Sequence, residues 1–194
     1  MTLGPKTIPS SRDDSEFLNV LDAAKRGEEW AWESIYGDLV GPVTGYLRSR
    51  GSKDAEDVAS EVFLQVARDL TRFDGPESKF RSWVFVIAHR RMLDERRAES
   101  RRPETVMDPL AQMNALGGNV EEDVMEELAL GRVSEIFETL TDEQRTVLTL
   151  RLVGDLTLEE TASVMGKRVG AIKALQRRAL LALKSAIESG AVSL

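Results

Sequence analysis

The chain has 194 residues, a formal net charge of −7 and 30% charged residues, with one histidine and no cysteine. These counts exclude disulfides and thiolate-bound metals, and the lone His89 cannot build a histidine cluster, which argues against a zinc-dependent function. The polar start up to Ser15 lacks the apolar core of a signal peptide, and no apolar run approaches membrane-spanning length, so we expect a cytoplasmic protein.

Apolar residues follow helical spacing through the first fifty positions. A first helix is expected to begin near Asp14 and to end at Gly27. The segment 28–50 continues the pattern but is interrupted around Gly41 and Pro42, which predicts either two helices or one kinked helix. The tryptophans and tyrosines of this segment could stack on bases, but their spacing is more typical of core residues.

The segment 54–70 predicts an amphipathic helix with an acidic first turn. Asp57 and Glu61 share one face of it, so a metal site or an acid–base pair has to be considered. No other type of ligand stands nearby, and acids are expected at any helix N-terminus, which argues against both. A third interpretation is an acidic ridge offered to a protein partner.

A basic helix is expected next, over 79–102, after a loop at 71–79 that contains Asp74, Gly75 and Pro76. One side of the helix is apolar, and the other carries most of the positive charge: Arg81, His89, Arg90, Arg91, Arg96, Arg97, Arg101 and Arg102. With aromatic residues at the edges of the loop, this arrangement suits a duplex backbone on one side and an unstacked base on the other. The alternative is that the aromatic residues are simply core.

The middle of the chain has the composition of a linker, with two prolines and two glycines between 103 and 119. Helical spacing returns over 121–140, behind a group of acids. Thr141 can then cap another helix, with Gln144 completing a capping box. Four apolar residues of this helix should form the core beneath the last two helices of the chain: Val147, Leu148, Leu150 and Leu152.

Residues 156–184 have the pattern of a helix-turn-helix. Thr157 can cap the first helix, Ala162 sits where two helices cross closely, and Gly166 suits a left-handed turn. The apolar stripe of the second helix comprises Val169, Ile172, Leu175, Ala179, Leu180 and Leu183. Its positive charges are Lys167, Arg168, Lys173, Arg177, Arg178 and Lys184.

A helix with one packed face and one basic face suits the major groove of DNA. A solvated amphipathic helix in a small bundle is the alternative. The net charge of −7 does not decide between them, because a local basic face governs the attraction of phosphate.

The motifs taken together resemble the extracytoplasmic-function (ECF) group of bacterial RNA polymerase sigma factors, of the sigma-70 family. The resemblance rests on DAEDVASEVFLQVARDL at 54–70, Arg72-Phe73, FRSWVFVIAHRRMLD at 80–94 and the segment 140–183, and it covers most of residues 15–188. It implies an all-α chain of two small helical domains joined by a flexible linker. The implied parts are a disordered tail 1–14, a sigma-2 domain 15–102, a linker 103–120, a sigma-4 domain 121–188 and a C-terminal tail 189–194.

The resemblance also implies a function without catalytic, cofactor or metal residues, because RNA polymerase core, with its beta-prime and beta subunits, supplies the chemistry. Asp57, Glu61 and Gln65 would dock on the beta-prime coiled coil. The implied contacts to the minus-ten element, including a flipped base in the loop, are Phe73, Lys79, Arg81, Arg90, Arg91 and Arg97. The helix-turn-helix would read the minus-thirty-five element through Arg168 and Lys173 and clamp its phosphates through Arg177 and Arg178. An anti-sigma factor and a nucleoid location in the holoenzyme are implied as well.

Three positions depart from the family pattern, and each weakens one implied contact. Ser60 stands where glutamine is usual, Ala67 where tryptophan is common, and Lys167 where the turn is usually closed by an apolar residue. Two rival hypotheses stay open. If the chain were a stand-alone helix-turn-helix regulator, the loop and basic helix at 71–102 would have no function. If it were a nucleic-acid-processing enzyme, its chemistry would depend on the carboxylates at positions 54, 57 and 61.

Overall fold

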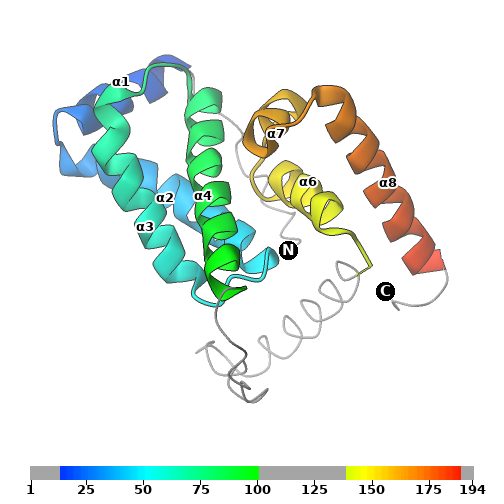
Figure 1. Ribbon diagram of the computed structural model, residues 1–194. Coiled ribbons are helices and arrows are strands. Elements are labelled where there is room, and N and C mark those ends of the chain that lie inside the picture. Colours follow the sequence, from blue (N-terminus) through cyan, green and yellow to red (C-terminus); the bar gives the residue numbers. More distant parts are fainter. Residues whose placement is uncertain (1–13, 101–138, 189–194) are drawn as a thin grey trace, which may run out of the picture.

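The computed structural model describes residues 14–100 and 139–188, and every regular element within these ranges is helical (Figure 1). The predicted all-α class is therefore confirmed. The expected linker 103–120, the helix over 121–140 except its last two residues, and both tails lie outside the described residues, apart from Asp14. The elements are α1 (Asp14–Lys25), α2 (Glu29–Ser49), α3 (Ala55–Asp69), η1 (Leu70–Arg72), α4 (Glu77–Glu99), α6 (Asp142–Leu152), α7 (Leu158–Met165) and α8 (Val169–Glu188).

The segment 28–50 forms one helix, α2, with Pro42 inside it. This decides between the two alternatives that the sequence left open. Its buried residues recur every four positions, at Ile35, Leu39, Val43 and Leu47. That row faces α1, α3 and α4, which all pack against α2. Packing along its whole length stabilises a helix that lacks the amide hydrogen bond Pro42 cannot donate.

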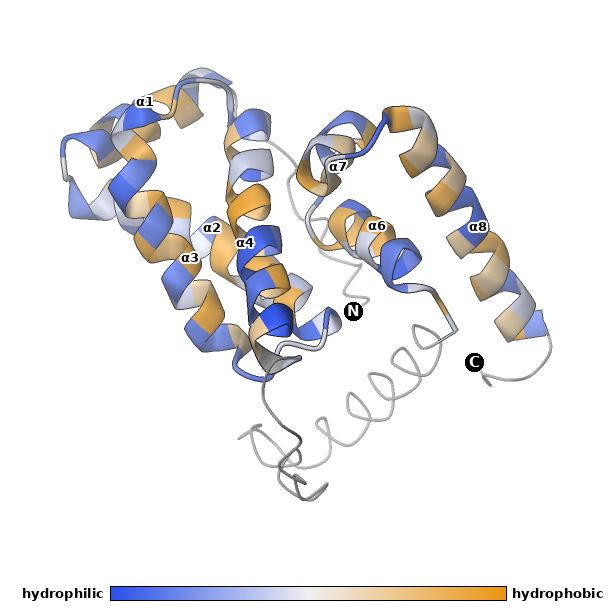
Figure 2. Cartoon of the chain, in the orientation of Figure 1, coloured by the Kyte–Doolittle hydropathy of each residue, from blue (hydrophilic) through white to orange (hydrophobic). Residues whose placement is uncertain are grey.

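The predicted loop at 71–79 is shorter in the structure. Helix α3 continues into the single turn η1, and α4 already begins at Glu77, so Lys79 lies in the first turn of α4. Pro76 takes the N-cap position with an extended backbone, where its missing amide costs nothing. Figure 2 shows that hydrophobic and hydrophilic residues alternate around the helices, as expected for amphipathic elements around a shared core.

The local signals of the second half are confirmed. Thr141 and Thr157 each form a capping box, with Gln144 and Glu160 respectively. Gly166 ends α7 in the left-handed conformation, at φ +62°. Ala162 is buried among residues of α6 and α8, where the helices cross.

Two predictions of buried leucines were wrong. Leu152 is the last residue of α6 and 71% of its side chain is exposed, while Leu180 is 50% exposed. The buried stripe of α8 runs through Ile172, Leu175 and Ala179. Leu180 lies about 100° around the helix from Ala179, so it falls beyond the edge of that stripe.

The helices form two units that touch: an N-terminal unit, α1 to α4, and a C-terminal unit, α6 to α8. Helix α7 packs on α4 and α6 contacts α2 (Figure 1). Leu150, Leu156 and Val164 of the C-terminal unit are buried in the same hydrophobic cluster as the core of the N-terminal unit. The two units therefore share one continuous core.

Candidate nucleic-acid and polymerase interfaces

An exposed basic surface lies along α8 and at the residue just before it. Its buried stripe holds the helix against α6 and α7, and the opposite side presents Arg168, Lys173, Arg177 and Arg178 to solvent. No carboxylate in the described part of the chain pairs with Arg168, Lys173 or Arg177, and the sequence has no acid from Thr161 to Ile187. These cations are therefore available to an anionic partner.

The remaining cations around α8 are engaged within the protein. Lys167 Nζ lies 2.7 Å from a carboxylate oxygen of Glu143, and Lys184 Nζ lies 3.6 Å from Glu188. Arg178 Nε donates to the carbonyl of Ala174 at 3.3 Å, which holds that side chain along its own helix. The ion pair of Lys167 explains how the turn accepts a charged residue at the position where the family usually has an apolar one.

Gln176 is a candidate that the sequence prediction missed. It is half-buried, and with Lys173, Arg177, Leu180, Leu181 and Lys184 it lines an open groove of about 390 Å³. A glutamine amide can bond the edge of adenine in the major groove, donating and accepting at once. The helical spacing that selected Lys173 could have found Gln176, because residues three apart share a face.

The acidic ridge on α3 exists as predicted, but a basic residue crosses it. Asp57 and Glu61 are exposed, and Leu64 between them and Gln65 is 57% exposed. Arg91 of α4 donates to Glu61 Oε2 at 3.0 Å and to the side-chain oxygen of Gln65 at 3.2 Å. The structure therefore brings together three residues that the sequence prediction had divided between the polymerase and the minus-ten surfaces.

Ser60 and Ala67, the other two positions that depart from the family pattern, also lie on α3. Ser60 is exposed and its hydroxyl donates to the carbonyl of Glu56 at 2.9 Å, so it bonds its own helix. Ala67 is exposed as well. Neither position offers the long or aromatic side chain that is usual in the family, and the exposed apolar surface of this ridge comes from Leu64 instead.

Phe73 belongs to an aromatic cluster at the start of α4. Its ring stacks on Trp83 with centroids 5.2 Å apart and meets the ring of Phe80 edge-on at 5.1 Å. It is half-buried, whereas Phe80 is fully buried. Trp83 thus already covers one face of the Phe73 ring, so a base could stack only on the part of the ring that is still exposed.

The predicted minus-ten cations are not equally available. Lys79 and Arg90 are exposed, and Arg97 is exposed but pairs with Asp94 at 3.1 Å. Arg81 is mostly covered, with Nη2 3.7 Å from Glu77 Oε1. Of the predicted set, Lys79 and Arg90 are therefore best placed to meet a phosphate.

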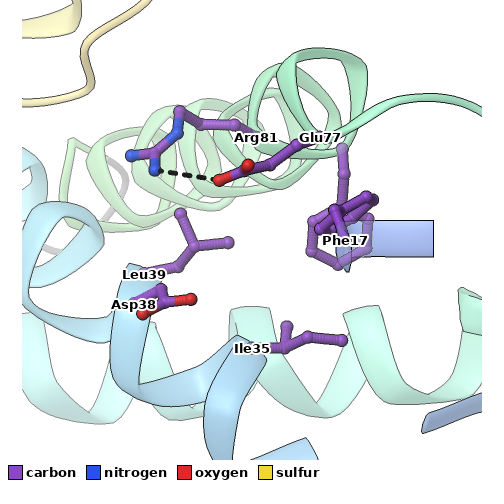
Figure 3. Close-up of a pocket in the computed structure, with 7 residues that line it drawn as sticks. Phe17, Ile35, Asp38, Leu39, Glu77 and Arg81 are labelled. Atoms are coloured by element: carbon purple, nitrogen blue, oxygen red, sulfur yellow. Dashed lines mark ion pairs between the residues drawn. The ribbon is translucent and has the colours of Figure 1, made fainter. Parts of the chain in front are cut away.

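Glu77 and Arg81 also line a small cavity with Phe17, Ile35 and Leu39, where α1, α2 and α4 meet (Figure 3). Its volume is about 10 Å³. The second oxygen of Glu77 is buried without a hydrogen-bond partner in the described residues. Such a space holds one water molecule, which could bond that oxygen, and is too small for an organic ligand.

The described residues offer no cluster of three carboxylate or histidine side chains that could hold a metal ion. Within the same residues, no helix combines the length and the apolar character needed to cross a lipid bilayer.

Comparisons with known proteins show to which family the chain belongs. The family model for Sigma-70 region 2 matches residues 33–102, and the model for Sigma-70 region 4 matches residues 136–185. The chain is 31% identical to the ECF RNA polymerase sigma factor BldN of Streptomyces coelicolor over 173 residues, which span 88% of this chain and 66% of that protein. It is 30% identical to the ECF RNA polymerase sigma factor SigD of Mycobacterium tuberculosis over 186 residues, or 92% and 88% of the two chains.

A solved structure shares the fold. CnrH, in complex with the cytosolic domain of CnrY, superposes with a TM-score of 0.65 at 23% identity, over 91% of this chain and 99% of that one.

Both region models match in the expected order, and SigD is covered over most of its length. The chain therefore belongs to the ECF sigma factors of the sigma-70 family.

Proposed function

We propose that this sigma factor recognises its minus-thirty-five element through α8, its minus-ten element through α4 and the preceding loop, and core polymerase through α3. The observation that carries the proposal is the exposed basic side of α8, whose Arg168, Lys173 and Arg177 have no acidic partner in the described residues. The polymerase provides the catalytic centre. This chain contributes binding and strand opening and is not itself an enzyme.

In the major groove, α8 would place its N-terminal half against base edges. Lys173 and Gln176 lie on one face there, and Arg168 stands just before the first residue of the helix. Arg177 and Arg178 would reach the flanking phosphates. The exposed leucines farther along the groove lie beyond the residues that would face the bases.

On α3, the exposed carboxylates of Asp57 and Glu61 share one side of the helix with the exposed Leu64. An exposed apolar side chain next to charged groups suits the centre of a protein–protein contact better than a metal site. The partner we propose is the coiled coil of the beta-prime subunit. Contact with the beta subunit is proposed for the C-terminal unit.

At the minus-ten element, Phe73 and the cations Lys79 and Arg90 would hold the non-template strand once a base has left the stack. Unstacking costs a few kcal/mol, so contacts to the opened strand must offset it. We also propose control by an anti-sigma factor, in keeping with the complex that CnrH forms with the cytosolic domain of CnrY. In the holoenzyme the chain would be associated with the nucleoid.

The test is run-off transcription by core polymerase, with and without this protein, on a library of genomic promoter fragments that includes pre-melted templates. We expect protein-dependent transcripts that share two upstream sequence blocks. Failure to bind polymerase, with binding of duplex DNA by the protein alone, would instead identify a stand-alone helix-turn-helix regulator. A metal-dependent nuclease assay on alanine variants of Asp54, Asp57 and Glu61 checks the enzyme alternative.

A further inference from the structure

The turn between α7 and α8 brings two cations to the start of α8. Gly166 ends α7, and the amide of Lys167 donates to the carbonyl of Ala162 at 2.9 Å, which fixes the backbone of the turn. The carbonyl of Arg168 accepts from the amide of Ile172 at 3.2 Å, so the hydrogen bonds of α8 begin at Arg168. Lys167 and Arg168 therefore lie at the end of α8 that enters the major groove in the proposed function.

The two cations differ in their surroundings. Lys167 Nζ lies 2.7 Å from Oε1 of Glu143, in the first turn of α6, whereas Arg168 has no carboxylate partner among the described residues. The side chain of Lys167 is 32% exposed and that of Glu143 is 55% exposed, so solvent reaches both partners. One of the two cations is thus neutralised within the C-terminal unit, and the other is not.

The ion pair between Lys167 and Glu143 can exchange partners. Ion pairs between exposed side chains contribute little to stability, because water screens the charges and two flexible side chains must be held in place. The four-carbon stem of lysine lets its ammonium group turn towards another anion without a change in the backbone. In a complex with DNA, the anions that border the groove beside the start of α8 are backbone phosphates.

The carboxylate of Glu143 opposes that exchange. A phosphate bound to Lys167 in its place would lie close to a carboxylate that has lost its partner, within the ~10 Å over which charges interact at about 0.1 M salt. Like charges repel at such a distance, so the contact with phosphate is weaker than an unpaired lysine would make. Phosphates are the same for every base sequence, so this effect of Glu143 does not depend on the sequence of the DNA.

We infer that Lys167 is a further phosphate-binding residue of this sigma factor and that Glu143 restrains it, which lowers the affinity for DNA of any sequence. The inference rests on the proposed function, in which α8 binds the minus-thirty-five element. Arg168 is available to DNA at once, whereas Lys167 becomes available only by leaving Glu143. Removal of the Glu143 charge should therefore add one phosphate contact.

The test measures the binding of the holoenzyme to labelled promoter fragments by fluorescence anisotropy, at a series of salt concentrations. One fragment carries a functional minus-thirty-five sequence and the other a scrambled one. Glu143→Gln keeps the size and polarity of the side chain and removes its charge. Each neutralised phosphate adds about −0.9 to the slope of log K against log salt, which corresponds to about an eightfold gain in affinity at about 0.1 M salt. We expect this gain and this steeper slope for Glu143→Gln on both fragments.

Lys167→Gln and the double variant show whether the gain comes from the lysine. If the freed lysine makes the new contact, Glu143→Gln should bring a much smaller gain in the Lys167→Gln background, and the double variant should keep the salt slope of the unmutated protein. Glu188→Gln is the matched control, because Glu188 pairs with Lys184 at 3.6 Å and lies at the far end of α8. It changes the net charge equally and also breaks an ion pair, but it should leave affinity and slope unchanged.

Three results would overturn the inference: an unchanged affinity and slope for Glu143→Gln, an equal gain in the Lys167→Gln background, or an equal gain for Glu188→Gln. Arg168→Ala separates this inference from the proposed function. If Arg168→Ala weakens binding while Glu143→Gln changes nothing, only the inference fails. If neither variant changes binding, α8 does not meet DNA and the proposed function fails as well. Circular dichroism of each variant checks that its helices remain folded.

Discussion

His89 should make the folded state sensitive to mild acid. Its ring lies between α2 and α4, with Nδ1 2.6 Å from the hydroxyl of Tyr46, and is half-buried. Burial lowers the pKa of His89 to about 4, and the positive charges of Arg50 and Arg96 add to the effect, with Asp142 opposing it. With its proton on Nε2, the neutral imidazole can accept a hydrogen bond from the Tyr46 hydroxyl, which the protonated ring could not.

The direction of the effect depends on which state binds the proton more tightly. Between pH 6.5 and pH 4 the unfolded chain takes up a proton at this position and the folded chain does not. The stabilisation is therefore complete above pH 6.5 and is lost as the pH falls toward 4. The free energy of unfolding should therefore fall by about 2 kcal/mol between pH 7.5 and pH 5, at 1.36 kcal/mol per pKa unit.

The measurement is urea denaturation of the wild type and of His89→Gln from pH 7.5 to pH 5, followed by circular dichroism. The glutamine carbonyl can still accept from Tyr46 but does not titrate, so the wild type should lose about 2 kcal/mol more than the variant. Asp142 does not confuse the comparison, because its pKa is lowered and its contribution is lost only below its ordinary value of 3.8. Parallel losses in the two proteins would refute the reasoning.

Other substitutions test the DNA-binding helix and the turn after α6. Lys173→Ala should weaken promoter binding by about 1–3 kcal/mol on the cognate minus-thirty-five sequence only, whereas Arg178→Ala should weaken all sequences alike; equal losses on cognate and scrambled sites for both would contradict this division. Gln176→Ala should relax selection at one base pair in a binding-site selection experiment, and an unchanged consensus would exclude it from base contact. Gly154→Ala should lower the free energy of unfolding by about 1–3 kcal/mol in urea, because the added Cβ meets the carbonyl of Leu150 at 2.7 Å; an unchanged midpoint would show that the turn can shift.

Local signals in the sequence predicted most of the helix boundaries. The capping boxes at Thr141 and Thr157 and the left-handed turn at Gly166 depend on residues within four positions of one another, and all are confirmed. Pro42 shows the limit of such signals. The sequence correctly indicated that Pro42 weakens a helix, but it could not show whether the helix ends there. Packing against α1, α3 and α4 decides that α2 continues through Pro42.

The side chains of the candidate sites were harder to place, because their partners are distant in sequence. Arg91 meets Glu61 thirty residues away, and Arg96 meets Asp142 forty-six residues away. Helical spacing shows that both arginines lie on the side of α4 away from the hydrophobic core. It does not show which residues of other helices lie opposite them. Leu152 illustrates the same point for apolar residues: it fits the apolar pattern of its helix, yet it is exposed.

The shared core has a consequence for how the chain is made. Phe85 is covered in part by Gly154, which leaves the ribosome about 55 residues after the end of α4. At about 5–20 residues per second, the N-terminal unit waits several seconds with an uncovered apolar face. During synthesis that face is open to aggregation or to a chaperone, and expression of residues 14–100 alone would leave it open permanently.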